Sequence, residues 1–164
     1  YTTEHTLSLH DALPISALGP GTEFVVGIGA GTIRRRIDER LVRLRWTPAT
    51  VVHPSATIGA DVTLGVGAVL FAGVHITTNV KLGRHVHVGR NSTVGHDCEV
   101  GDFVTINPLV AVSGGVVLGD EVMMGAHSSI LQNLTMGSRS VAGAASCVVR
   151  DVSADTIVRG VPAR

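Results

Sequence analysis

The sequence predicts a parallel β-helix, a solenoid of short parallel strands, from three observations. Every sixth residue between Val52 and Val148 is apolar, and the register never slips. Glycine follows ten of these 17 residues, and the residue four places after each is always small or aliphatic. Two inward positions in every six residues fit a short strand and a turn, whereas a helix would repeat about every 3.6 residues. The apolar series consists of Val52, Ile58, Leu64, Leu70, Ile76, Leu82, Val88, Val94, Val100, Ile106, Val112, Leu118, Met124, Ile130, Met136, Ala142 and Val148.

Three hexads close one triangular coil in such a repeat, so residues three hexads apart are expected to stack. The composition agrees, because 20 glycines with only three Phe, one Trp and one Tyr leave a layered core short of large side chains. The glycine after each aliphatic residue indicates a corner that needs either a positive φ or a close approach of two backbones.

The segment before the repeat predicts a βα unit. Residues 24–29 have the pattern of a buried strand, and residues 32–44 carry apolar side chains at helical spacing. The glycines of Gly27-x-Gly29-x-Gly31 are a weak nucleotide-binding signal, and a tight turn between strand and helix is the simpler interpretation.

These patterns divide the chain into four parts. Residues 1–23 follow neither pattern and are expected to be an extraneous or disordered leader. Residues 24–46 are interpreted as the remnant of an α/β domain, because a lone strand cannot form a parallel sheet. The β-helix is expected at residues 47–150 and a C-terminal tail at residues 151–164.

Charge and composition exclude several functional classes. Thirteen basic and 13 acidic residues leave a net charge of zero, so no surplus is available for the phosphates of a nucleic acid. The longest apolar stretches, such as residues 68–74, are too short to span a bilayer. Two cysteines cannot form a disulfide framework, and no signal peptide is recognisable. We therefore expect a soluble, cytoplasmic protein without nucleic-acid or membrane partners.

The hexads and the C-terminal sequence Gly160-Val161-Pro162-Ala163-Arg164 resemble the left-handed β-helix (hexapeptide-repeat) acyltransferases. The runs His53-Pro54-Ser55-Ala56 and Val94-Gly95-His96-Asp97-Cys98-Glu99-Val100-Gly101 are similar to sugar O- and N-acetyltransferases of the sialic acid and bacillosamine pathways. The resemblance covers about residues 24–164. It implies a left-handed coil, a homotrimer, a preceding Rossmann-like domain that helps to hold a sugar nucleotide, and acetyl-CoA as co-substrate without a metal.

His96 is the candidate general base. It lies two places after the inward Val94, at an outward corner, and Asp97 follows it directly. On position alone, a structural role is the simpler interpretation. The resemblance implies instead that His96 takes the proton from an amine or hydroxyl as this group attacks the thioester of acetyl-CoA, with Asp97 raising its basicity. His75, His85, His87 and His127 occupy other non-core positions, where a surface or interface imidazole is expected.

The same resemblance implies that coenzyme A lies in a groove between adjacent β-helices of the trimer. The matching positions are Thr105, Gly114, Ala126, Ala144, Gly160 and Pro162. Close relatives can have a histidine at the position of Thr105. For Gly114 and the alanines, simple packing at corners is an equally direct interpretation.

Two alternative functions stay open at this point. The chain could be a catalytically impaired trimeric scaffold that binds coenzyme A, because the contacts of a β-helix are local and survive the loss of a domain. It could also resemble the γ-type carbonic anhydrases, whose zinc ligands include two histidines five residues apart. The repeat has no such pair, so a metal site is not expected. Cys98 falls on an inward position, where a thiol packs like a small apolar group.

Overall fold

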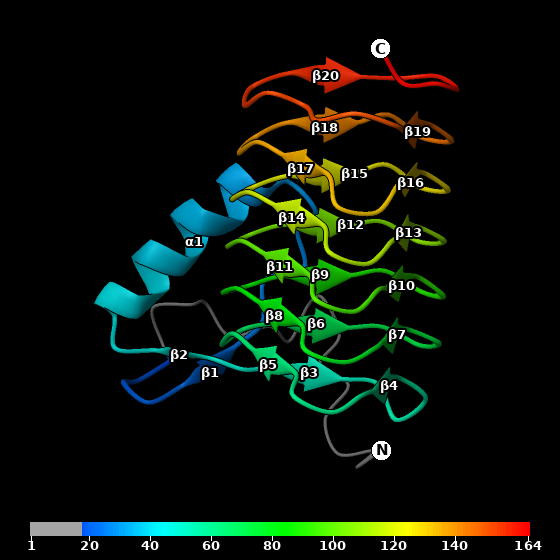
Figure 1. Cartoon of the computed structure of the whole chain (residues 1–164). Helices are drawn as coiled ribbons and strands as arrows, with labels where there is room; N and C mark the ends of the chain where they lie inside the picture. The colour runs from blue at the N-terminus through cyan, green and yellow to red at the C-terminus, as the bar shows by residue number, and fades with distance from the viewer. Residues whose placement is uncertain (1–17) are drawn as a thin grey trace.

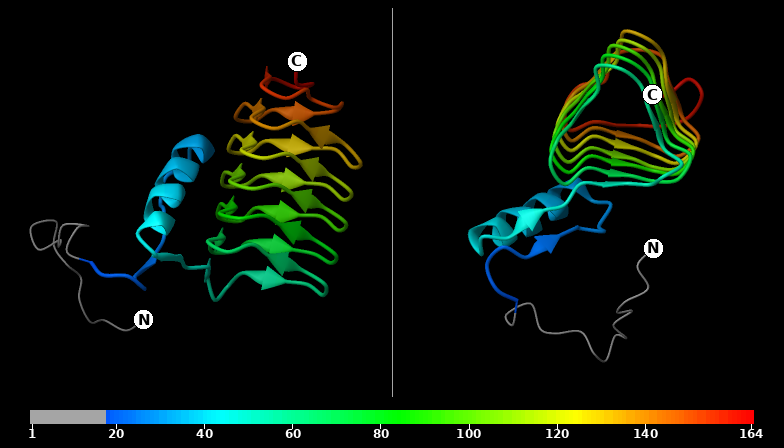
Figure 2. Two further views of the ribbon diagram at one scale, coloured as in Figure 1. Left: turned by 90° about the vertical axis from the view of Figure 1, so that its left-hand side faces the viewer. Right: turned by 90° about the horizontal axis from the view of Figure 1, so that it is seen from below.

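A computed structural model describes residues 18–164, and these residues form a left-handed parallel β-helix with one α-helix beside it (Figure 1). The expectation of a leader at residues 1–23 falls mostly on residues 1–17, which lie outside the described residues. The coils stack into a column of triangular cross-section (Figure 2).

Three parallel sheets form the sides of the column. Bonded residues are one coil apart, which is 18 positions up to β19, as where Thr93 pairs with both His75 and Ala111. In the last coil the separation is 16 positions, as where Ala142 pairs with Val158. The seven-stranded sheet contains β3 (Val51–Val52), β6 (Val69–Leu70), β9 (His87–Val88), β12 (Thr105–Ile106), β15 (Met123–Met124), β18 (Val141–Ala142) and β20 (Ile157–Val158). The six-stranded sheet contains β4 (Thr57–Ile58), β7 (His75–Ile76), β10 (Thr93–Val94), β13 (Ala111–Val112), β16 (Ser129–Ile130) and β19 (Cys147–Val148). The five-stranded sheet contains β5 (Thr63–Leu64), β8 (Lys81–Leu82), β11 (Glu99–Val100), β14 (Val117–Leu118) and β17 (Thr135–Met136).

The corners explain the glycines of the repeat. A Cβ on Gly59 would lie 2.3 Å from the Thr77 carbonyl oxygen of the next coil, so glycine is needed there for the close approach of two backbones. The positive φ falls two residues later, mostly at non-glycine positions such as Asn79 (55°) and Asp97 (57°), and in a few coils at a glycine such as Gly67 (75°). Asn and Asp tolerate this conformation better than most residues. Of the two explanations that the sequence allowed, close approach is therefore the correct one for Gly59.

The column has three corners, each named after a feature that lies on it. The histidine corner follows the six-stranded sheet and includes residues 77–80, 95–98 and 113–116. The alanine corner follows the seven-stranded sheet, at residues 71–74, 89–92, 107–110, 125–128 and 143–146. The helix corner follows the five-stranded sheet, at residues 83–86, 101–104 and 119–122.

The N-terminal part is a small β-α-β unit. Strand β1 (Glu23–Phe24) precedes α1 (Gly31–Arg43) and pairs in parallel with β2 (Thr47–Pro48). The observed β1 is shorter than the predicted strand, because the chain leaves the sheet after Phe24. Its partner β2 comes from residues that the sequence assigned to the β-helix, so the strand is not alone. Phe24, Val26, Leu41 and Trp46 form a separate small core.

The segment expected as a C-terminal tail extends the column. Val152 forms a parallel bridge with Met136, and β20 adds to the seven-stranded sheet beside β18. Val158 and Ala163 are buried in the main core.

Within residues 18–164, no helix has the length and apolar character needed to cross a membrane.

Candidate active site

His96, Asp97 and Asn79 form a hydrogen-bonded chain on the histidine corner. The Nδ1 atom of His96 lies 2.6 Å from Oδ2 of Asp97. Asn79, one coil earlier, donates its side-chain amide to Oδ1 of Asp97 at 2.6 Å. The hydrogen bond from Asn79, and then that from His96, lower the pKa of Asp97 below its usual value. Asp97 is therefore a carboxylate at neutral pH and orients the His96 ring.

This arrangement fixes the role of each ring nitrogen. With the proton on Nδ1 donated to Asp97, Nε2 is left as the acceptor. Both side chains are exposed, 65% for His96 and 55% for Asp97, so Nε2 can meet a substrate. A Cβ on Gly114 of the next coil would lie 2.6 Å from Nε2. The structure therefore brings together three of the residues that the sequence predicted, His96, Asp97 and Gly114.

Other predicted residues lie on the alanine corner instead. Ala126 and Ala144 are one coil apart, and the Ala145 amide donates to the Ala126 carbonyl at 2.8 Å. Gly160 continues this row, since its carbonyl accepts from the amide of Cys147 at 3.0 Å. Pro162 follows in the same turn, after a cis peptide bond. Within one chain, these small residues do not share a corner with His96.

Thr105 lies on neither of these corners. It begins β12, is 5% exposed, and donates its hydroxyl to the Gly29 carbonyl at 2.6 Å. Nη2 of Arg34 donates to the same hydroxyl at 3.1 Å. Thr105 thus ties the β1–α1 loop to the seven-stranded sheet.

A cavity of about 280 Å³ lies at this junction. The glycine loop before α1 forms one wall, and residues of the seven-stranded sheet and the alanine corner form the other. Its polar and loop residues include Gly27, Gly29, His87, Arg90, Thr105 and Asn107. Sequence reasoning missed this cavity and its residue His87, because the position of the β-α-β unit over β9 cannot be deduced from the repeat.

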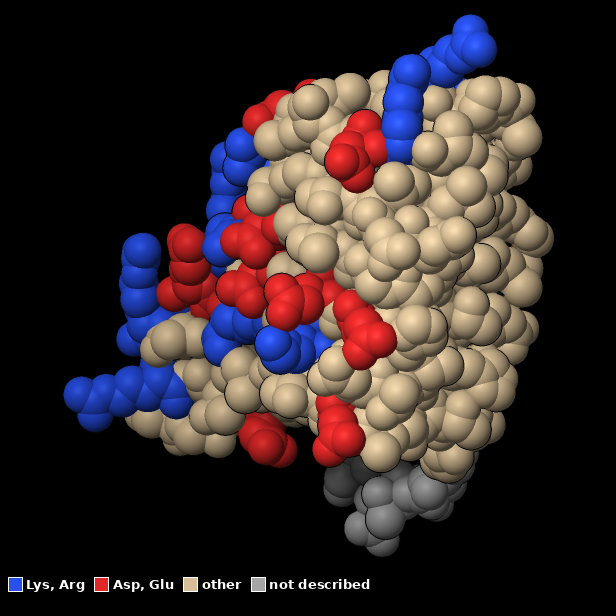
Figure 3. All heavy atoms as spheres, in the orientation of Figure 1, with Lys and Arg blue, Asp and Glu red and all other residues tan. Residues whose placement is uncertain are grey.

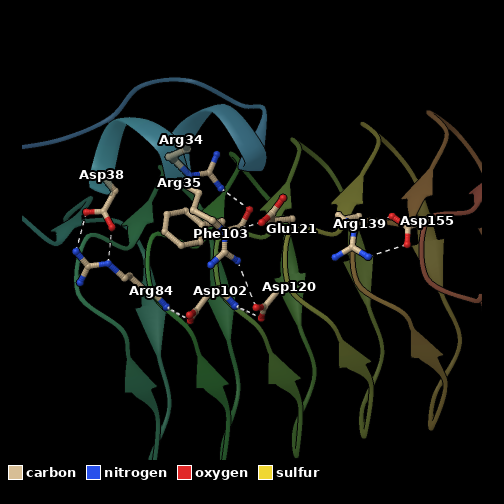
Figure 4. A network of polar contacts seen from close by, with 10 residues as sticks. All are labelled: Arg34, Arg35, Asp38, Arg84, Asp102, Phe103, Asp120, Glu121, Arg139 and Asp155. Carbon is tan, nitrogen blue, oxygen red and sulfur yellow. Dashed lines mark hydrogen bonds and ion pairs between the residues drawn. The ribbon is translucent and has the colours of Figure 1, made fainter. Parts of the chain in front are cut away.

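Arg34 and Asp38 dock α1 onto the helix corner (Figure 4). Arg34 is fully buried and donates to the carbonyls of His85 (3.0 Å) and Phe103 (2.7 Å), and burial lowers its pKa to about 10. Asp38 accepts two hydrogen bonds from Arg84, at 2.6 and 2.7 Å, and lies 2.9 Å from His85 Nε2. Arg34 also donates to the carbonyls of Ile28 (2.7 Å) and Gly29 (3.2 Å), which fixes the glycine loop beside the cavity.

The expectation of a surface imidazole holds for the exposed His75 and His127, whereas His85 and His87 are buried beneath the β-α-β unit. The His85 ring stacks between Phe24 and Phe103, with centroid distances of 5.9 and 5.4 Å. Burial lowers the pKa of both histidines, that of His87 to about 4.

The charged residues are unevenly distributed over the surface. On the face shown in Figure 3, Lys, Arg, Asp and Glu side chains gather around α1 and the helix corner, and much of the remaining column carries none. On the alanine corner, Phe71 is 44% exposed and Leu109 is 45% exposed. Among residues 18–164, no group of three or more His, Cys, Asp or Glu side chains could hold a metal ion.

Comparison with known proteins identifies close structural relatives. No protein-family model and no curated protein matches the chain. The acetyltransferase domain of PglB from Neisseria gonorrhoeae is 32% identical, with a TM-score of 0.84 over 87% of this chain and 69% of that chain. PerB from Caulobacter crescentus, solved with CoA and GDP-perosamine, is 29% identical, with a TM-score of 0.86 over 87% and 69%. WeeI from Acinetobacter baumannii is 26% identical, with a TM-score of 0.84 over 88% and 70%.

The chain thus spans about two thirds of the length of these proteins. The likeness covers the β-helix and the β-α-β unit together, because 87% of the chain is matched. Fold, repeat and identity agree, and the chain belongs to the left-handed β-helix sugar acetyltransferases of the hexapeptide-repeat type.

Proposed function

We propose that this enzyme transfers an acetyl group from acetyl-CoA to an amino or hydroxyl group of a sugar or sugar nucleotide, with His96 as the general base. The observation that carries this proposal is the hydrogen-bonded chain from Asn79 through Asp97 to His96, which leaves Nε2 accessible. Two relatives support the choice of substrates. The PglB domain has been solved with acetyl coenzyme A, and PerB with CoA and GDP-perosamine.

The chemistry is a direct transfer. Nε2 of His96 accepts a proton from the acceptor amine or hydroxyl as its nitrogen or oxygen attacks the thioester carbonyl carbon. The new C–N or C–O bond forms, the C–S bond breaks, and the proton passes to the departing thiolate to give free coenzyme A. Asp97 stabilises the imidazolium between these two steps. No covalent bond to the enzyme is required, so most of the acceleration comes from orientation and electrostatic stabilisation.

A homotrimer would place the histidine corner of one copy beside the alanine corner of the next. His96 and the row of Ala126 and Ala144 lie on different corners of one protomer, so a groove between two copies is the arrangement that brings them together. A closed threefold ring provides three such grooves. The exposed Phe71 and Leu109 on the alanine corner give this contact an apolar surface to bury. Coenzyme A would lie in the groove, along the small side chains.

The cavity under the glycine loop is the proposed acceptor site. Pro108 lines it and lies one coil before Ala126, as the hydrogen bond from the His127 amide to the Pro108 carbonyl at 3.1 Å shows. The cavity therefore adjoins the row of Ala126 and Ala144, along which coenzyme A is proposed to lie. Its mixture of apolar and polar walls is typical of small-molecule sites.

The test is calorimetric titration of the purified chain with acetyl-CoA, followed by a thiol-release assay. The acceptor panel contains GDP-perosamine, further nucleotide-linked amino sugars, free amino sugars and sialic acids. We expect binding and turnover, and sedimentation should give the mass of a trimer. Binding without turnover would favour the coenzyme A scaffold, and the absence of binding would contradict both functions.

A further inference from the structure

His87 is buried at the wall of the acceptor cavity, in a position where its polarity has no structural use. It begins β9 and pairs in register with Val69 on one side and Thr105 on the other. Only 7% of the residue is exposed, and the imidazole lines the cavity together with Gly27 and Gly29 of the glycine loop.

The hydrogen bonds around the cavity leave Nε2 of His87 without a partner. The hydroxyl of Thr105 is occupied by Gly29 and Arg34. Asn107 donates its side-chain amide to the Met124 carbonyl at 2.8 Å. Nε2 of His87 is buried, and no residue of the described part hydrogen-bonds to it. A buried polar atom without a partner costs free energy, so an apolar side chain would suit the fold better here.

The surroundings of His87 keep its imidazole uncharged. Burial, followed by the nearby positive charge of Arg34 and a contribution from His85, lowers its pKa to about 4. Among the residues that line the cavity, Arg90 carries the positive charge, and it is exposed. An uncharged imidazole has one N–H donor and one bare nitrogen. Because Nε2 is enclosed without an acceptor, a proton on Nε2 would have nothing to donate to. The proton is therefore assigned to Nδ1, which becomes the donor available to a ligand.

We propose that His87 is a specificity-determining residue that hydrogen-bonds a hydroxyl or amino group of the acceptor sugar, while Arg90 meets an anionic group at the rim. None of the ion pairs between residues 18–164 includes Arg90, so its guanidinium is available for a phosphate. A sugar linked to a nucleoside diphosphate fits this cavity better than a free sugar, because its hydroxyls can meet the uncharged His87 while its diphosphate meets the positive charge of Arg90. This inference rests on the proposed function of the cavity.

The test compares His87→Leu and His87→Asn with the native chain. Leu fills a similar volume without polarity, and Asn retains a donor close to the position of Nδ1. For the nucleotide-linked sugar that is turned over, we expect His87→Leu to raise the acceptor KM by about tenfold or more. Its kcat and its KM for acetyl-CoA should stay within about twofold, and its Tm should be unchanged or higher. His87→Asn should recover part of the lost affinity.

Two controls separate this role from a structural one. His75→Leu replaces a histidine at the same strand position on β7, where the side chain is exposed, and should leave both KM values unchanged. The His87→Leu effect should be the same from pH 6 to 8.5, because an imidazole with a pKa near 4 does not titrate there.

The outcomes are distinguishable. An unchanged acceptor KM in His87→Leu, or a lowered Tm with equal losses for both substrates, would overturn the role of His87 while native turnover upholds the proposed function. If the native chain turns over no acceptor of the panel, the proposed function fails and this inference fails with it.

Discussion

His96 and Asp97 are consecutive residues, yet their side chains meet, with Nδ1 of His96 2.6 Å from Oδ2 of Asp97. The positive φ of Asp97 (57°) turns the backbone at the corner and makes this contact possible. Asn79 of the preceding coil donates a hydrogen bond to the other carboxylate oxygen of Asp97. The pair therefore depends on the stacking of two coils as well as on the local sequence.

Replacing His96 with Ala should abolish most of the turnover without affecting the fold. The side chain is 65% exposed and makes no core contact, so the Tm should stay within about 1–2 °C. Loss of a general base lowers kcat by about 10²- to 10⁴-fold. Steady-state kinetics and calorimetry with acetyl-CoA check both parts. Unchanged turnover would remove His96 from the mechanism, and lost acetyl-CoA binding would point to a role in cofactor binding.

Replacing Asp97 with Asn should slow the reaction by loosening the His96 ring. The hydrogen bonds from Asn79 and His96 lower the pKa of Asp97, so the native carboxylate is charged throughout the neutral range, and its Oδ2 lies 2.6 Å from Nδ1 of His96. An uncharged amide is a weaker acceptor for Nδ1 and holds the ring less firmly. We expect kcat/KM to fall about 10- to 100-fold at pH 7. Asn79→Ala should produce the same change to a smaller extent. An unchanged kcat/KM in Asp97→Asn would show that Asp97 does not position His96.

Replacing Gly114 with Ala should displace the His96 imidazole. The added Cβ would lie 2.6 Å from His96 Nε2, and the exposed ring can swing away at little cost to stability. Turnover should fall towards the level of His96→Ala, with an unchanged Tm. The double variant Gly114→Ala with His96→Ala should be no slower than His96→Ala alone. Additive losses would mean that Gly114 acts on the substrate directly.

The repeat predicted the β-helix well because each inward residue is specified locally. The period of six residues fixes both the strands and their register, and positions 18 apart pair as expected. The same arithmetic accounts for the grouping of the site residues. Gly114 is one coil after His96, and Ala144 is one coil after Ala126, whereas 12 residues separate Gly114 from Ala126 and place them on different corners.

The β-α-β unit was harder to predict, because its contacts join distant parts of the chain. Asp38 contacts Arg84 and His85, and Arg34 reaches Phe103, at separations of 46 to 69 residues. A periodic repeat carries no signal for which coil receives the helix. The cavity and the burial of His87 follow from this docking, so they could not be derived from the sequence.

The docking of α1 should weaken in acid. His85 and His87 have pKa values lowered by burial, so the unfolded chain binds more protons than the folded one as the pH falls below about 6.5. For Asp38, burial raises the pKa, but the hydrogen bonds from Arg84 and His85 outweigh it and lower the pKa overall. Its contribution is present above about pH 4 and is lost as the pH falls further.

We therefore expect stability to be highest near neutral pH and to decrease between pH 6.5 and 4, with His87 alone contributing up to about 3 kcal/mol. Hydrogen exchange at pH 7, 5.5 and 4.5 measures this locally. The amides of α1 should lose protection before those of the β-helix, because neighbouring coils stabilise one another independently of the helix.

Asp38→Asn should weaken the docking of α1 already at pH 7, since Arg84 loses a charged acceptor, whereas Glu39→Gln on the exposed side of α1 should not. Equal protection of α1 at pH 7 and 4.5 would show that these buried groups do not link docking to protonation.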